Sequence, residues 1–444
     1  MVQARSPKDG RDEGSAPRRR MEIGSCCSAD CLASLTGLPA LLRAACGSRA
    51  PRKDFANQGP SQPTVELLKG NQAPGQQAAA RPWERDGRFD EGPLTGQNKW
   101  LGGAMSLDGT IYGMPGHAKQ VLKIEPGSGD VSLVGGPFEG EFKWLRGVRG
   151  NDGCVYGIPS WAETVLKIKP DGEVCTIGGP LLGQWKWHGG VLGNDGAIYG
   201  IPANAESVLK IIPATGEVTT IGGPLVGKNK WYGGILGNDG AIYGIPACAN
   251  SVLKIVPSTG EVTTIGSLPD GGWKWHGGVK ARDGTMYGIP SNHDYVLKIV
   301  PETGEVTTIG PKIPGGKHRS DGKYKFLGGV LAGDGTIYGM PGDADAVLKI
   351  QPDTGEVTTI GGPFNEPGEN KWQNGFLGRD GFVYGIPLRA ESVLKINPMT
   401  STVTTIGGPL PGKDKWEGGV VGMDGALYCM PLRAKAVLRI DPAH

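Results

Sequence analysis

The sequence is poor in the features that mark metal-binding, membrane-spanning or nucleic-acid-binding proteins. Its eight cysteines form no Cys-x-x-Cys pair, so neither a zinc site nor a redox-active disulfide is indicated. No apolar run approaches the roughly 20 residues of a transmembrane helix. The formal net charge is only +2, which provides no general attraction to nucleic acid or to an anionic membrane. We therefore expect no metal, no cofactor, no nucleic-acid partner and no membrane span.

The first 82 residues carry little that would form a folded domain. Residues 1–20 are highly charged and poor in apolar side chains, which is typical of disorder. The apolar stretch 31–46 starts late for a secretory signal and is interrupted by Pro39 and Arg43, so cleavage stays an open alternative. Residues 47–82 resemble a linker in composition, with room for a short helix at 64–69. We interpret residues 1–82 as a disordered or targeting tail and linker.

Glycine and proline are abundant instead, and they are periodic. Gly accounts for 77 residues and Pro for 35, and both recur within a unit of about 44 residues that is present in eight copies. Each copy starts with a Lys-aromatic pair, continues with Asp-Gly and Tyr-Gly-Ile/Met-Pro, and then has Val-Leu-Lys-Ile. The anchor aromatic residues are Trp100, Trp144, Trp187, Trp231, Trp275, Phe326, Trp372 and Trp416.

Each unit is predicted to form four short β-strands. The Asp-Gly pair supplies the positive φ angles of a tight hairpin after the first strand, Gly-Gly-Val-Leu. The second strand, Ala-Ile-Tyr-Gly-Ile, ends at Pro, which cannot donate to a ladder. Val-Leu-Lys-Ile and Glu-Val-Thr-Thr-Ile follow as the third and fourth strands. A repeated four-stranded unit of this length is typical of a propeller blade, so we predict an all-β, eight-bladed β-propeller over residues 83–444.

Closure of the ring is the open question in this sequence. The eighth copy ends at His444 after its third strand, so its fourth strand must come from elsewhere. In register with the repeat, residues 86–92 stand where other copies have Glu-Val-Thr-Thr-Ile-Gly-Gly, and Pro93-Leu94 matches the repeat. We therefore predict that residues 86–92 add the missing strand. The alternative is an open or seven-bladed ring with one leftover copy.

The motifs Asp-Gly-x-Ile-Tyr, Val-Leu-Lys-Ile-x-Pro and Thr-Gly-Glu-Val-Thr give the repeat a family likeness. Over residues 93–444 it resembles the streptogramin-lyase-like and NHL/YVTN-like propellers, which implies the same fold. The lyase-like proteins usually have Trp-Phe and an acidic residue where this chain has Tyr-Gly-Ile-Pro. No arrangement of His and Glu matches that family's catalytic motif, so the resemblance assigns no catalytic residue here.

Candidate binding residues are those that differ between the otherwise similar copies. The position after the anchor aromatic lies beside the inner Gly-Gly strand and is expected to line the axial channel. It holds leucine in three copies and His188, Tyr232, His276, Gln373 and Glu417 in the other five. We predict that these five contact a ligand, and the alternative is a tolerant, partly hydrated position. Since the histidines lie two copies apart, they need not meet, and we do not expect a shared metal.

A second variable position lies in the loop after Ile-Pro, between the second and third strands. With the loops between blades it forms one face of the ring, and loops on a rigid scaffold often carry binding. The candidate ligand contacts there are His117, Trp161, Asn204, Asn292, Asp343, Arg389 and Arg433, with Cys248 in the fourth copy. Neutral drift of a surface loop is the alternative. The basic insertion 311–323 belongs to the same face, where it would suit an acidic partner.

A lysine precedes every anchor aromatic, and a second series of basic residues occupies the third strands. Because these residues recur in every blade, we predict a structural role between blades. Their stems would pack on Trp or Tyr, with the ammonium groups at the surface.

These patterns favour a non-catalytic binding or scaffold propeller, a monomer that recognises a protein, peptide or carbohydrate on the loop face. The lack of Ser-His-Asp, Cys-His and P-loop patterns supports that interpretation. The alternative is a lyase- or lactonase-type enzyme with its site at the mouth of the central channel. It would use His188, His276, Glu417 or Asn292.

Overall fold

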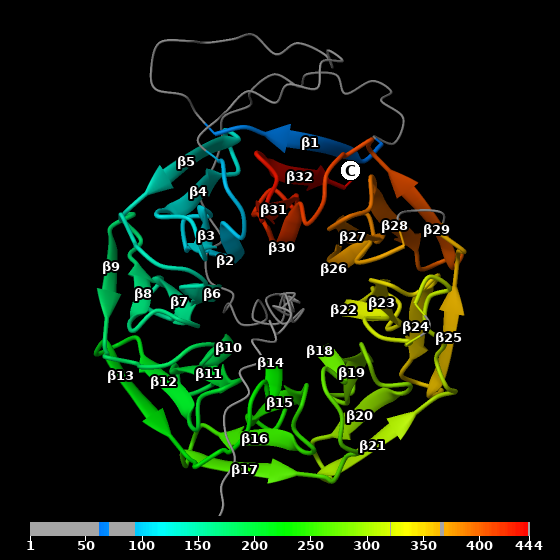
Figure 1. Cartoon of the computed structure of the whole chain (residues 1–444), viewed down its shortest axis with the longest axis horizontal. Helices are drawn as coiled ribbons and strands as arrows, with labels where there is room; N and C mark the ends of the chain where they lie inside the picture. Colours follow the sequence, from blue (N-terminus) through cyan, green and yellow to red (C-terminus); the bar gives the residue numbers. More distant parts are fainter. Residues whose placement is uncertain (1–61, 71–93, 320, 365–367, 443–444) are drawn as a thin grey trace, which may run out of the picture.

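The computed structural model describes residues 62–70, 94–319, 321–364 and 368–442. These residues form eight four-stranded antiparallel sheets around one axis (Figure 1). The described ranges contain strands and turns and no helix. The prediction of an eight-bladed β-propeller is therefore confirmed, and the seven-bladed alternative is wrong.

The strands occupy equivalent positions in every blade. The innermost strands are β2 (Trp100–Met105), β6 (Trp144–Arg149), β10 (Trp187–Leu192), β14 (Trp231–Leu236), β18 (Trp275–Lys280), β22 (Phe326–Leu331), β26 (Trp372–Leu377) and β30 (Trp416–Val421). The second strands are β3 (Ile111–Pro115), β7 (Val155–Pro159), β11 (Ile198–Pro202), β15 (Ile242–Pro246), β19 (Met286–Pro290), β23 (Ile337–Pro341), β27 (Val383–Pro387) and β31 (Leu427–Pro431). The third strands are β4 (Val121–Glu125), β8 (Val165–Ile168), β12 (Val208–Ile212), β16 (Val252–Val256), β20 (Val296–Val300), β24 (Val347–Gln351), β28 (Val393–Asn397) and β32 (Val437–Asp441). The outer strands are β5 (Asp130–Val134), β9 (Val174–Ile177), β13 (Glu217–Ile221), β17 (Glu261–Ile265), β21 (Glu305–Ile309), β25 (Glu356–Ile360), β29 (Thr402–Ile406) and β1 (Thr64–Leu68).

The third blade shows how the repeat sequence forms its sheet. In the hairpin after β10, Gly196 has φ of 81°, which glycine adopts without strain. Asp195 keeps a negative φ and uses Oδ1 to accept the amide N–H of Ala197, so only the glycine supplies the positive angle predicted for the pair. The indole Nε1 of Trp187 donates to the carbonyl of Ser207, 2.9 Å away. The anchor tryptophan thereby ties the inner strand to the loop before the third strand.

Blades pack on one another through small and β-branched residues as well as aromatic ones. Gly222 follows the third blade's outer strand at φ of 66°, and a Cβ added there would lie 2.5 Å from Cβ of Val262 in the next blade. Gly178 and Val218 make the same contact one blade earlier. Only glycine allows this approach, because any side chain would collide with the valine. The Gly-Gly-Pro segments after the outer strands therefore set the spacing between blades.

The lysine before each anchor aromatic is buried, with 1–3% of its surface exposed in all eight blades. In the third blade, Nζ of Lys186 donates to the carbonyls of Ser160 in the preceding blade and Gly183 in the connecting loop, both at 2.9 Å. It also lies 6.0 Å from the centre of the Trp187 ring. The structural role between blades thus agrees with the prediction, but the predicted surface position of the ammonium groups is wrong. Carbonyl oxygens of the preceding blade and of the connecting loop accept hydrogen bonds from these ammonium groups in the interior.

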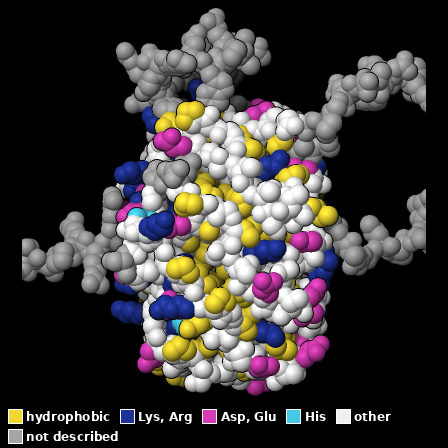
Figure 2. Space-filling model, turned by 90° about the vertical axis from the view of Figure 1, so that its right-hand side faces the viewer, with side chains coloured by type: hydrophobic (Ala, Val, Ile, Leu, Met, Phe, Trp, Pro, Cys, Tyr) yellow, Lys and Arg dark blue, Asp and Glu magenta, His cyan; other side chains and the backbone are white. Residues whose placement is uncertain are grey.

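The outer strands form the rim of the ring. In β13 two of the five side chains are exposed and three are half-buried, so this strand meets solvent more than the inner strands do. Figure 2 shows part of this rim from the side, with hydrophobic side chains interspersed among charged ones of both signs. No surface of a single charge dominates this side of the molecule, in keeping with the small net charge.

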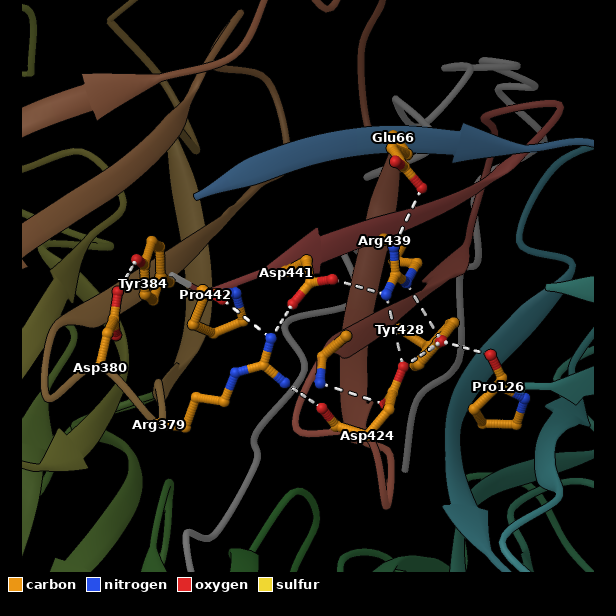
Figure 3. Close-up of polar contacts among 11 residues, drawn as sticks. Glu66, Pro126, Arg379, Asp380, Tyr384, Asp424, Tyr428, Arg439, Asp441 and Pro442 are labelled. Atoms are coloured by element: carbon orange, nitrogen blue, oxygen red, sulfur yellow. Dashed lines mark hydrogen bonds and ion pairs between the residues drawn. The ribbon is translucent and has the colours of Figure 1, made fainter. Parts of the chain in front are cut away.

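The ring closes through β1, which pairs antiparallel with β32 from Thr64↔Asp441 to Leu68↔Val437. This is the register of every other outer strand on its third strand. Arg439 secures the junction: it donates to Glu66 of β1 at 3.1 Å and to the Tyr428 hydroxyl at 3.2 Å (Figure 3). Residues near both ends of the chain therefore contribute to the eighth blade, which has four strands like the other seven.

Two predictions about this junction are wrong. The missing strand is formed by residues 64–68, where we expected a short helix, and not by residues 86–92, which lie outside the described residues. The in-register argument failed because the segment between β1 and β2 need not have the length of an ordinary blade connection. Leu94 nevertheless takes its repeat position, since it is fully buried and packs with Trp100.

Candidate functional site

The residue after each anchor aromatic is set apart from the regular ladder by a bulge. In the third blade Trp187 pairs with Pro202, and the register then shifts before Gly190 pairs with Gly200. The same shift occurs in all eight blades. Bulges of this kind re-aim a side chain. Here they produce a circle of eight buried side chains at the starts of the innermost strands, which we call the axial ring: Leu101, Leu145, His188, Tyr232, His276, Leu327, Gln373 and Glu417.

Three aromatic members of the axial ring form one stack across three consecutive blades. The ring centroids of His188 and Tyr232 are 3.6 Å apart, and those of Tyr232 and His276 are 4.6 Å apart. Trp273 adds an edge contact to Tyr232 at 5.8 Å. Sequence separation suggested that the two histidines need not meet. In the structure each histidine contacts Tyr232, the ring residue of the blade between theirs.

His188 is held in its neutral form by its surroundings. Burial lowers its pKa well below the ordinary value, and the positive charge of Arg146 and the neighbouring His276 lower it further. Among the described residues, its Nδ1 has no hydrogen-bond partner. A buried imidazole nitrogen without a partner loses free energy relative to water. The leucines at this position in three other blades avoid that cost.

Two residues next to the axial ring were missed in the sequence. The first glycine of the Gly-Gly pair is replaced by Arg146 in the second blade and by Asn374 in the seventh. They keep the positive φ of the glycines, 66° and 58° respectively, which is uncommon for arginine. The aliphatic stem of Arg146 lies against Gly102 and Gly189 of the two adjoining blades. The break in an otherwise repeated Gly-Gly pair was the signal that could have revealed both residues.

Gln373 and Glu417 lie on the innermost strands of the seventh and eighth blades, β26 and β30, and each is 1% exposed. In Figure 1 these strands lie across the axis from β14, which carries Tyr232. The five predicted residues of this set therefore belong to one ring but not to one cluster. Leu327 in the sixth blade separates the stack from the pair on one side, and Leu101 and Leu145 in the first and second blades separate them on the other.

The second predicted set occupies contacts between blades. Asn204 donates to the carbonyl of Gln184 and accepts the amide N–H of Asn229 at 2.8 Å. Asn292 repeats this bridge in the fifth blade, where it accepts the amide N–H of Tyr324 at 3.0 Å. These asparagines hold the loop that enters the following blade. Binding of a ligand by this set stays a prediction.

The remaining members contact the loop that enters their own blade or the next one, through other chemistry. Arg389 pairs with Asp414 at 3.0 Å and with Glu369 at 2.9 Å, and Arg433 lies 3.5 Å from Asp414. Aromatic contacts replace these polar ones in the first two blades. His117 meets Phe142 at a centroid distance of 4.3 Å, Trp161 meets Trp185 at 5.6 Å, and in the fourth blade Cys248 is half-buried.

Asp343 anchors the basic insertion 311–323 to the ring. Its buried carboxylate accepts the amide N–H of Asn370 at 2.6 Å and pairs with Arg319 at 3.0 Å. Arg319 also pairs with Asp321, and Lys312 pairs with Asp294 at 3.1 Å. Part of the positive charge of the insertion is thus neutralised by carboxylates of this chain. Docking of an acidic partner there stays a prediction.

In the ranges that the structure describes, no three His, Cys, Asp or Glu side chains come together as metal ligands. Cys154, Cys175 and Cys248 are free thiols. Nowhere in those ranges does a helix have the length and apolarity to cross a bilayer.

Comparison with known proteins agrees with the architecture. A family model described as a repeat of unknown function, DUF6923, matches residues 190–332. A solved streptogramin B lyase structure is similar with a TM-score of 0.51 at 14% identity, covering 85% of this chain and 97% of that one. This chain is a propeller repeat protein.

A second similar structure is a catalytically inactive virginiamycin B lyase from Staphylococcus aureus with quinupristin. Its TM-score is 0.53 at 14% identity, covering 86% of this chain and 99% of that chain. The curated proteins contain no match to this propeller. At such identities the likeness shows the fold alone.

Proposed function

We propose that this propeller is a non-catalytic binding protein whose ligand, a peptide or glycan, contacts the axial ring. The observation that carries the proposal is the aromatic stack at a position where leucine also fits. His188 is 6% exposed and has a buried nitrogen without a partner among the described residues. Polar groups that cost stability are commonly retained where a ligand uses them.

The test compares variants of the stack on peptide and glycan arrays. Tyr232→Leu and His188→Leu place in the stack the side chain that three other blades already have. We expect each to lower the affinity for a bound ligand at least tenfold, while the exposed Tyr295→Leu leaves it unchanged. We also expect His188→Leu to raise the melting temperature, because it removes the unpaired nitrogen. Binding that depends on Trp161 (tested as Trp161→Ala) and not on the stack would instead assign the ligand to the loop face.

A second candidate is a lyase-type enzyme at the same ring, favoured by the two histidines that meet at Tyr232. The fold likeness to streptogramin B lyase makes quinupristin a direct probe. The protein would be incubated with quinupristin, with and without divalent metal ions, and the products would be analysed by mass spectrometry. We expect no cleavage. Cleavage that is lost in His188→Leu or in a His276→Leu variant would make the propeller an enzyme.

A further inference from the structure

The closing strand β1 is attached to its blade differently from the other outer strands. In the other seven blades, a turn of four or five residues joins the third strand to the outer strand, as residues 398–401 join β28 to β29. β1 and β32 have no such turn, because they lie near opposite ends of the chain and meet through their ladder and side chains. β1 can therefore leave its blade without unfolding a hairpin, and elements held in this way open locally at low cost.

The connection that follows β1 is longer than the ring requires. Residues 69–99, 31 in all, join β1 to the inner strand of the first blade, whereas the other seven junctions have from nine residues (135–143) to sixteen (310–325). Nine residues therefore suffice to reach the next inner strand. Since each additional residue can extend the reach by about 3.3 Å, β1 of one molecule can reach the eighth blade of another.

The contacts that hold β1 come from β32 and from the blades beside it. Val65 and Leu67 pack into the core between the seventh and eighth blades, and Leu68 packs into the core between the eighth and first blades. Glu66 accepts a hydrogen bond from Arg439 of β32 at 3.1 Å (Figure 3). Since every copy of the chain presents these partners, β1 of a second copy would make the same contacts.

We propose that two copies of this chain exchange β1, so that each completes the eighth blade of the other. Exchange of an identical element gives a dimer at low cost, because each ring keeps the contacts of the closed monomer. The monomer is the main form in dilute solution, since a strand on the same chain acts as if present at about millimolar concentration. The dimer forms when β1 is released at high protein concentration, as during refolding. This inference is independent of ligand binding at the axial ring.

The test reverses the charges of Glu66 and Arg439, which lie opposite each other in the ladder. Glu66→Arg alone or Arg439→Glu alone places like charges opposite each other, which destabilises a strand pair. When the two variants are mixed, exchange of β1 gives each ring a pair of opposite charges.

Equal amounts of the two full-length variants are unfolded in urea with a thiol reductant, mixed, and refolded at high protein concentration. Native mass spectrometry identifies the heterodimer by its mass. We expect about five times more dimer from the mixture than from either variant refolded alone, because only the mixture relieves the repulsion. The unmodified chain should give a fraction of dimer that increases with the protein concentration during refolding.

The chain that carries both substitutions is the matched control. Its own β1 and β32 are complementary again, although it lacks the hydrogen bond from Arg439 to the Tyr428 hydroxyl. It should give no more dimer than the unmodified chain at the same concentration. The two single variants mixed after folding should form the heterodimer much more slowly than during refolding, because β1 must first be released.

Three results overturn the inference: monomers alone from the refolded mixture, as much dimer from the doubly substituted chain, or a heterodimer that forms equally fast from folded variants. If Arg439→Glu folds only together with Glu66→Arg, exchange of β1 is supported. If neither variant folds, the unmodified chain decides. A dimer that increases with refolding concentration and returns slowly to monomer on dilution supports exchange, and monomers at every refolding concentration overturn it.

Discussion

The aspartate of each Asp-Gly turn receives a hydroxyl hydrogen bond, but the donor changes from blade to blade. In three blades a threonine after the glycine donates, as Thr285 does to Asp283 at 2.8 Å. In the other five blades that residue is Ala, Cys or Phe, and the tyrosine two residues further donates, as Tyr199 does to Asp195 at 2.7 Å. The residue after the glycine therefore determines whether a threonine or a tyrosine hydroxyl donates to the aspartate.

Because the donor differs between blades, replacing tyrosine by phenylalanine should lower the free energy of unfolding by different amounts at Tyr199 and Tyr287. Tyr199→Phe removes the donor to Asp195 and should lower the free energy of unfolding by about 1 kcal/mol. Tyr287→Phe should cost less, because Thr285 already donates to the aspartate of that blade. The measurement is the urea midpoint of both variants at neutral pH. Equal losses would contradict the assignment.

At the scale of elements, the closing strand β1 completes the eighth blade. Val65 of β1 packs against Gly407 of the seventh blade, and a Cβ added there would lie 2.8 Å from Cβ of Val65. Six other glycines make the same contact with a valine of the next blade: Gly135, Gly178, Gly222, Gly266, Gly310 and Gly361. Without β1, the eighth blade would expose the edge of β32 and leave this contact empty, and exposed edges promote association.

Two truncations should distinguish the contribution of the closing strand to stability from that of the residues before it. Removal of residues 1–70 should lower the melting temperature and cause self-association, while removal of residues 1–61 should do neither. Differential scanning fluorimetry and analytical ultracentrifugation measure the two effects. A synthetic peptide of residues 62–70 should restore the stability of the shorter chain. Equal stability of both truncations would show that β1 does not maintain the ring.

At the scale of the whole molecule, the buried lysines form a titratable ring. Burial lowers the pKa of Lys99, Lys143, Lys186 and Lys230 from 10.5 to about 8. Between these two values the unfolded chain binds more protons than the folded one. The free energy of unfolding therefore rises with pH over this range, by about 1.4 kcal/mol per lysine and per unit of pKa shift at most.

The tyrosines reverse this trend at higher pH. Burial and the nearby Asp283 raise the pKa of Tyr287 from 10.0 to about 12, so the unfolded chain loses tyrosine protons first and stability falls. We expect maximal thermal stability near pH 10 in melting curves taken from pH 7 to 11. Lys186→Met with Lys230→Met should flatten the rise, whereas the exposed Lys228→Met should not. A steady fall in stability above pH 8 would contradict a ring of buried lysines.

The sequence by itself determined the repeat unit, its four strands, the Asp-Gly turns and the number of blades. These features depend on contacts within a blade, such as Trp187 with Ser207, which join residues close in the chain. The residues of the candidate site are departures from the repeat and were predicted as such, except Arg146 and Asn374, whose replacement of the first glycine of the Gly-Gly pair was not used.

Only the tertiary structure decided how the ring closes, where the lysine ammonium groups lie and which site residues meet. Thr64–Leu68 resembles the outer strand Thr402–Ile406 in its apolar pattern, but it lies outside the repeat spacing, and its partner β32 is at the other end of the chain. The stack of His188, Tyr232 and His276 joins three blades. Contacts of this kind depend on the curvature of the whole ring, which no single repeat encodes.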